Sequence, residues 1–138
     1  MNLIELSGAF CQNYLFCLKK ASQDLHITLS QSLCLISIPF NGISQSNLAK
    51  KLGLDISTLS RNLNKLIIMD LIQKENSNYD KRSFKIRLTS DGHKIYNKLI
   101  KIVEHDLNRI FNSFNIDEKD QMIELLNKIN WQFEIIKK

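Results

Sequence analysis

The chain of 138 residues contains one proline and four glycines, so it has few residues that break regular structure. A proline inside a helix removes a hydrogen bond, and its near absence therefore favours a mostly helical fold. No apolar run approaches the roughly 20 residues that a membrane-spanning helix needs, so we expect no membrane partner. The start, MNLIELSGAF, lacks the basic region of a signal peptide and carries Glu5 there. This pattern predicts a cytoplasmic protein.

Residue patterns typical of catalysis or metal binding are missing as well. The three cysteines, Cys11, Cys17 and Cys34, show no metal-ligand spacing, and their odd number argues against a disulfide framework. The sequence holds no nucleophile–base pair, carboxylate dyad or glycine-rich phosphate loop. We therefore expect no catalytic residue, no metal and no cofactor, and an enzyme is the weaker alternative.

Positive charge is concentrated in the middle third of the chain. The net charge is +5, from 19 Lys and Arg against 14 Asp and Glu. Residues 50–94 hold ten of the basic and five of the acidic residues, so they account for the whole excess. A solvated surface does not require this asymmetry, whereas a surface that binds a polyanion does.

Two short helices joined by a tight turn are predicted in this region. Ser44 opens the first helix, and Gly53 stands where a C-terminal cap prefers glycine. Asp55 caps the second helix, which is expected to run to about Met69. A helical wheel separates an apolar side from a polar side without acids, whose residue types bind base edges and phosphates. The apolar side has Ile56, Leu59, Leu63, Leu66 and Ile67, and the polar side has Ser57, Thr58, Arg61, Asn62 and Lys65.

A β-hairpin is predicted directly after the second helix. Leu71–Glu75 read as one strand, residues 76–81 as a turn, and Ser83–Leu88 as a half-exposed strand with alternating apolar and basic residues. A basic hairpin in this position is a wing, which would meet the DNA backbone and minor groove. Its basic residues are Lys81, Arg82, Lys85 and Arg87.

Long helices are predicted on both sides of the basic region. The first and last are apolar on more than one side, too broadly for a single core-facing stripe. The additional apolar surface needs a partner, most simply a second subunit. The four flanking helices are expected over Leu3–Asp24, from Thr28 or Ser30 to Pro39, from a cap at Thr89 to about Phe114, and from a cap at Asp117 onwards.

The run ISQSNLAKKLGLDISTLSRNLNKLIIMDLIQKENSNYDKRSFKIRLTSDG, Ile43–Gly92, resembles the winged helix–turn–helix of MarR-type transcriptional regulators. The joint match comprises LAKKLGLD, the STLSR start of the recognition helix, and DKR followed by LTSDG. The resemblance implies a mostly α (α+β) fold: a winged helix–turn–helix with a two-stranded β wing and N- and C-terminal dimerisation helices. It implies one domain over residues 1–138, with a helical dimerisation region over 1–28 and 95–138 and a DNA-binding region over 29–94.

The resemblance also implies a homodimeric, sequence-specific DNA-binding transcriptional regulator, a repressor released by a small-molecule effector or by oxidation. Its partner would be double-stranded DNA with a pseudo-palindromic operator. The alternative is a weakly specific architectural or antisilencing DNA-binding protein. Asp70 stands where the family usually has Gly, but Asp tolerates the left-handed conformation better than most residues. Carried over residue by residue, Ser57, Thr58, Arg61, Asn62 and Lys65 fall on the recognition helix, and Asp80, Lys81 and Arg82 on the wing.

Two ways of releasing the DNA remain open. Phe10, Tyr14 and Phe40 would line a pocket for a small aromatic effector, as in several relatives, or else form part of the dimer core. Cys11 and Cys17 lie on the first helix, where some relatives sense oxidants, although neither is clearly in register with the sensing position. A helix-borne Cys among Phe and Leu is usually an inert small hydrophobe.

Overall fold

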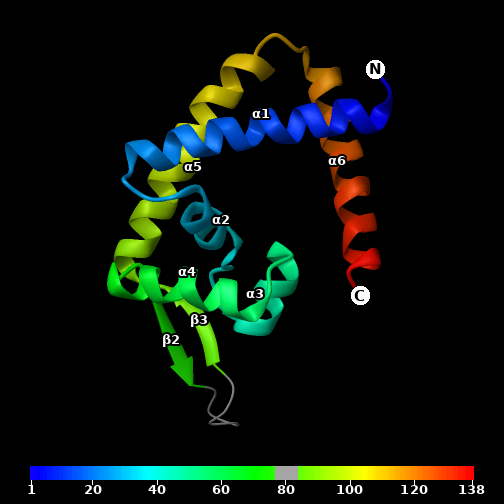
Figure 1. Ribbon diagram of the computed structural model, residues 1–138. Coiled ribbons are helices and arrows are strands. Elements are labelled where there is room, and N and C mark those ends of the chain that lie inside the picture. Colours follow the sequence, from blue (N-terminus) through cyan, green and yellow to red (C-terminus); the bar gives the residue numbers. More distant parts are fainter. Residues whose placement is uncertain (77–83) are drawn as a thin grey trace. The chain divides into compact units, whose positions relative to one another are not determined.

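The computed structural model describes residues 1–76 and 84–138. The chain divides into two compact units, residues 1–103 and residues 104–138. Within the described residues no helix is long and apolar enough to cross a membrane. The elements are α1 (Leu3–Asp24), α2 (Leu29–Ser37), β1 (Ile43–Ser44), α3 (Gln45–Leu52), α4 (Ile56–Ile68), β2 (Ile72–Asn76), β3 (Phe84–Leu88), α5 (Ser90–Phe111) and α6 (Ile116–Ile136) (Figure 1).

The predicted fold class is confirmed, with one addition to the sheet. β2 and β3 form the expected antiparallel hairpin, in which Ile72 pairs with Leu88 and Asn76 with Phe84. β1 lies on the other side of β3, so the order in the sheet is β1-β3-β2. A strand of two residues is too short to show an alternating pattern, which is why the sequence did not reveal β1.

The helix boundaries follow from local capping. Thr28, Ser44 and Asp55 each accept a hydrogen bond from a backbone N–H in the first turn of α2, α3 and α4, as predicted. Gly53 ends α3 in the left-handed conformation, with φ of 66°. The prediction that Asp117 caps the last helix was wrong.

Asn115 caps α6 instead, because its side chain accepts from the Glu118 N–H while the Glu118 carboxylate accepts from the Asn115 N–H. This reciprocal pair satisfies two N–H groups at once, which a cap two residues later would leave unpaired. Asp117 lies in the first turn of α6.

The hydrophobic core of residues 1–103 lies among α2, α3, α4 and the sheet. Leu35, Leu48, Leu63 and Ile86 are fully buried, one from each of these elements. α1 joins this core through its C-terminal half, where the Ser22 and Ser32 hydroxyls hydrogen-bond at 2.6 Å in a buried contact between α1 and α2. The core cluster consists of Ile27, Cys34, Leu35, Ile38, Leu48, Ala49, Leu59, Leu63, Leu66, Leu71, Ile72, Ile86 and Leu88.

The end of α4, the start of β2 and the start of α5 meet at one junction. Asp70 has φ of 57°, the left-handed conformation expected at this position. The Thr89 hydroxyl donates to the Asp70 carbonyl at 2.6 Å and accepts from the Gly92 N–H at 3.0 Å, so Thr89 caps α5 as predicted. The Thr89 N–H also donates to the Leu71 carbonyl at 3.1 Å. We refer to Asp70, Leu71, Thr89 and Gly92 as the helix junction.

Gly92 permits this close approach. A Cβ at Gly92 would lie 1.9 Å from the Leu71 carbonyl oxygen, which is backbone and cannot move aside. Gly8, in α1, is a matched contrast because a Cβ there would meet nothing within 4 Å.

We expect Gly92→Ala to lower the free energy of unfolding by about 1–3 kcal/mol or more, because the methyl group must push α5 away from Leu71. The control Gly8→Ala should raise it by about 0.5–1 kcal/mol, because Ala favours the helix over Gly. Urea unfolding followed by circular dichroism, at one fixed protein concentration, measures both changes. Equal effects of the two substitutions would contradict the role given to Gly92.

Candidate nucleic-acid interface

α4 is anchored by a narrow apolar stripe. Leu59, Leu63 and Leu66 are fully buried, and their spacing of four and three residues places them on one side of the helix. Ile56 and Ile67 were predicted on the same buried side but are 52% and 36% exposed. They lie at the edge of the stripe, where the neighbouring elements leave them partly open to solvent.

The predicted polar residues lie on the surface side of α4. Ser57, Arg61 and Lys65 are exposed, and they share one side of the helix opposite the buried leucines. Thr58 and Asn62 flank this side and are half-buried. We call Ser57, Thr58, Arg61, Asn62 and Lys65 the recognition face. The sequence of α4 contains no acidic residue.

Two further residues share this surface and were missed from the sequence. Asn64 is exposed, and Ile68 is 84% exposed beside Arg61 and Lys65 on the helical wheel. The helical wheel already places Ile68 between Ser57 and Arg61, but its apolar side chain did not mark it as part of a polar surface. An apolar side chain on such a face is suited to contact with a thymine methyl group.

A hydrogen-bond network fixes the start of α4. The Asp55 carboxylate accepts from the Ser57 hydroxyl at 2.6 Å, from the Thr58 N–H at 2.8 Å and from the Thr58 hydroxyl at 2.8 Å. These bonds, with the Ser57 hydroxyl contributing most, hold the pKa of the Asp55 carboxyl well below its usual range. The carboxylate is therefore ionised at neutral pH.

α3 holds α4 and α2 in place through side chains at its two ends. The Gln45 amide donates to the Ser60 hydroxyl at 2.6 Å, which ties the first turn of α3 to the middle of α4. The Lys51 ammonium donates to the Ser37 carbonyl at 3.0 Å, at the end of α2. Cations are favourable at the C-terminus of a helix, because of its partial negative charge.

The described part of the wing carries one ion-paired arginine and two exposed lysines. Arg87 Nε lies 2.9 Å from Glu75 Oε2, so this arginine forms an ion pair within the sheet. Lys85 is exposed, and Lys74 lies over the Phe84 ring at 5.9 Å. The predicted turn over residues 76–81 lies largely outside the described residues, and the predicted wing contacts Asp80, Lys81 and Arg82 lie entirely outside them.

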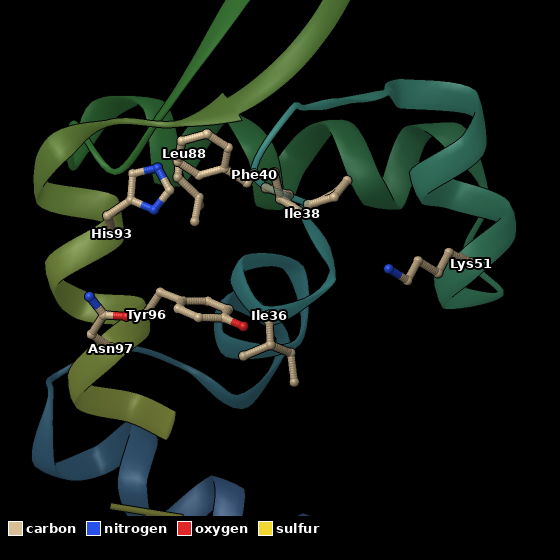
Figure 2. A pocket seen from close by; sticks show the side chains of 9 residues that line it. Ile36, Ile38, Phe40, Lys51, Leu88, His93, Tyr96 and Asn97 are labelled. Atoms are coloured by element: carbon tan, nitrogen blue, oxygen red, sulfur yellow. The ribbon is translucent and has the colours of Figure 1, made fainter. Parts of the chain in front are cut away.

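A cavity of about 310 Å³ lies between α2 and the start of α5. Figure 2 shows Lys51 reaching toward it from α3, opposite His93, Tyr96 and Asn97 of α5. Phe40, 86% exposed, also lines it, and its ring lies against the His93 ring in a tilted contact with a centroid distance of 5.6 Å. The lining is completed by Ile36, Ile38, Pro39 and Leu88.

The three residues predicted to bind an effector are divided by the structure. Phe40 lines the cavity, whereas Phe10 and Tyr14 lie on α1 and are not among the described residues that line it. Phe10 is 49% exposed and Tyr14 is half-buried. The α5 residues of the cavity were not singled out in the sequence, because they fall within an ordinary amphipathic helix.

The three cysteines differ in their surroundings. Cys11 is exposed and Cys17 is half-buried, both on α1. Cys34 is buried in the core, and this burial raises its thiol pKa from 9.0 to about 11. Its thiol is therefore neutral at physiological pH, which makes Cys34 unreactive because the thiolate is the nucleophile.

The helix–turn–helix, the hairpin beside it and the acid-free recognition face define a winged helix–turn–helix protein. Residues 27–84 match the model of the MarR family. The chain is 32% identical over 113 residues to an uncharacterised HTH-type transcriptional regulator of Bacillus subtilis, YybA, covering 81% of this chain and 75% of that protein. It therefore belongs to the MarR family of transcriptional regulators, as the resemblance predicted.

Solved structures agree with this assignment. The apo form of MarR from E. coli is 27% identical, with a TM-score of 0.79 over 94% of this chain and 96% of that chain. A cysteine-to-serine mutant of the same protein, solved in complex with operator DNA, is 27% identical with a TM-score of 0.73 over 92% of each chain.

Proposed function

We propose that this protein is a homodimeric, sequence-specific DNA-binding repressor that acts in the cytoplasm and is released from its operator by an effector. The recognition face is the observation that carries the proposal. It is polar, basic and free of acids, and buried leucines together with bonds from Asp55 and Gln45 hold it in a fixed orientation. The MarR structure with operator DNA supports a DNA partner for this fold.

On DNA, the recognition face would enter the major groove and the wing would reach the minor groove. Arg61 and Lys65 suit guanine edges or phosphates, and Asn62 suits adenine. Arg82 at the wing tip, oriented by Asp80 and accompanied by Lys81, is assigned to the minor groove by the family resemblance. A two-fold symmetric dimer would bind a pseudo-palindrome with half-sites about 10 bp apart.

Exposed apolar surface supports the dimer. The stripe on α1 that is buried at Leu18 and Ala21 continues to Phe10, Leu6 and Leu3, which are exposed. No residue of α6 is buried, yet Met122, Leu126, Ile129 and Phe133 recur every three or four residues along it. Large contiguous apolar patches mark interaction sites. We assign residues 1–28 and 95–138 to dimerisation and residues 29–94 to DNA binding.

The cavity is the proposed effector site. Its apolar walls, together with the Lys51 ammonium and the Tyr96 and Asn97 polar groups, suit a small aromatic acid. His93 directly follows Gly92 of the helix junction, and Tyr96 and Asn97 lie about one turn further along α5. The junction joins α5 to the end of α4. A ligand that displaces α5 would thereby shift the recognition face, provided that it binds the displaced state more tightly. Oxidation of Cys11 or Cys17 is the alternative route to release.

The first test is a fluorescence titration of intergenic DNA upstream of the protein's own gene, with random duplex as the control and several salt concentrations. We expect Lys65→Ala to reduce the slope of log K against log salt by about one, because one phosphate contact is lost. Lys98→Ala, an exposed lysine on α5, is the matched control and should leave the slope unchanged. Tight binding with no preference over random duplex would instead indicate the architectural alternative.

We expect Ile129→Asp to weaken the dimer strongly, because a carboxylate would enter the apolar stripe of α6. Asn127→Asp introduces the same charge on the opposite side of α6 and should leave the dimer intact. Sedimentation equilibrium measures the mass of each variant, and circular dichroism reports whether it is folded. A dimer equally stable in both variants would exclude the α6 stripe from the interface.

We expect a benzoate-class acid to weaken DNA binding of the wild-type protein and to act much less on Lys51→Met, which keeps the aliphatic length but removes the charge. Lys50→Met is the control, since Lys50 is exposed and does not line the cavity. Fluorescence anisotropy of labelled operator against acid concentration measures the effect. An identical response of both variants would place the effector elsewhere.

A further inference from the structure

We propose that Asp55 sets the hydrogen-bond polarity of the recognition face by accepting hydrogen bonds from the hydroxyls of Ser57 and Thr58, so that both hydroxyls meet DNA only as acceptors. This inference rests on the proposed DNA-binding function. It adds which groups on the bases these two side chains can read, and it makes Asp55 a specificity-determining residue that acts through its neighbours.

Both hydroxyls already donate a hydrogen bond to the Asp55 carboxylate. Ser57 Oγ lies 2.6 Å from Asp55 Oδ1, and Thr58 Oγ1 lies 2.8 Å from Asp55 Oδ2, so each carboxylate oxygen receives one hydroxyl. The bonds are short and charge-assisted, which makes them about twice as strong as bonds between neutral groups. A hydroxyl has a single proton and two acceptor lone pairs. Because the Ser57 and Thr58 hydroxyls each donate their one hydrogen bond to Asp55, only their lone pairs are available to accept from the DNA.

Acceptor-only hydroxyls discriminate among the groups in the major groove. Cytosine N4 and adenine N6 carry N–H donors there, whereas guanine O6 and N7 and thymine O4 are acceptors. Phosphate oxygens are also acceptors. Ser57 and Thr58 would therefore favour an amino group of cytosine or adenine at the positions they face. A freely rotating hydroxyl can bond to either a donor or an acceptor and would therefore not distinguish one base from another.

The charge of Asp55 strengthens this selection. The residue is exposed at the start of α4, beside a recognition face that contains no acid of its own. Its carboxylate repels phosphates from the same end of the helix that presents Ser57 and Thr58. Non-specific complexes, which rely on phosphate contacts, bear this repulsion without a compensating contact to a base.

The decisive variant is Asp55→Asn. Asn is as good an N-terminal cap as Asp, and its single carbonyl oxygen still serves the Thr58 N–H. The amide supplies one acceptor instead of two and no negative charge, so at least one hydroxyl proton becomes available to the DNA. Asp91→Asn is the matched control, since it removes the same charge from the first turn of α5, where Asp91 lies 3.7 Å from Lys94.

The experiment selects binding sites from a random duplex library with wild type, Asp55→Asn and Asp91→Asn. Each protein is then titrated against the wild-type site, random duplex, and sites in which purine replaces adenine or pyrimidinone replaces cytosine. We expect wild type and Asp91→Asn to lose about 3- to 10-fold in affinity when the amino group facing Ser57 or Thr58 is deleted, the range of one hydrogen bond. Asp55→Asn should lose little at the position facing Thr58, whose hydroxyl donated to the replaced Oδ2, and should bind random duplex more tightly and accept guanine or thymine at that position.

Other outcomes separate the possible failures. If wild type shows no sequence preference, the proposed function fails and the role of Asp55 fails with it. If wild type selects a site but Asp55→Asn keeps the same base preference and the same losses, only the role of Asp55 is overturned. Circular dichroism confirms that each variant is folded, and Asp55→Ser, with another favourable cap, replaces Asp55→Asn if that variant is not.

Discussion

The contact between Gly92 and the Leu71 backbone is the constraint on which the arrangement of the first unit depends. It lets α5 begin directly against the end of α4, close enough for Thr89 to bond both Asp70 and Leu71. The end of α4, the start of β2 and the start of α5 are thereby held together at Asp70 and Leu71. The sheet, the recognition face and the cavity-lining turns of α5 all take their positions from it.

Much of this arrangement could be predicted because it is local. Caps at Thr28, Ser44 and Asp55 and the glycine after α3 act within one turn, so their residue types identify the helix boundaries. The left-handed Asp70 was also anticipated, from a departure from the family's glycine. The cap of α6 was misplaced because Asn115 and Asp117 are both good caps, and only the reciprocal bond with Glu118 decides between them.

What the sequence did not reveal depends on contacts between distant segments. β1 exists because Ile43 and Ser44 pair with β3, and two residues carry no pattern of their own. The cavity depends on α2, α3 and α5 meeting, which no single segment reveals. The recognition face was found because one helix supplies it whole. Of the residues that line the cavity, only Phe40 was singled out in the sequence, because the others lie on separate elements and form no local pattern.

Ser44 belongs to two elements at once, as the last residue of β1 and the cap of α3. The sheet is therefore joined covalently to the first helix of the motif, and Gln45 carries the connection on to α4 through Ser60. The base of the wing and the recognition helix are thus linked through Ser44, Gln45 and Ser60. Under the proposed function, DNA binding by either would hold the other near its own groove at a high effective concentration, so the second contact would form without the entropic cost of a separate encounter.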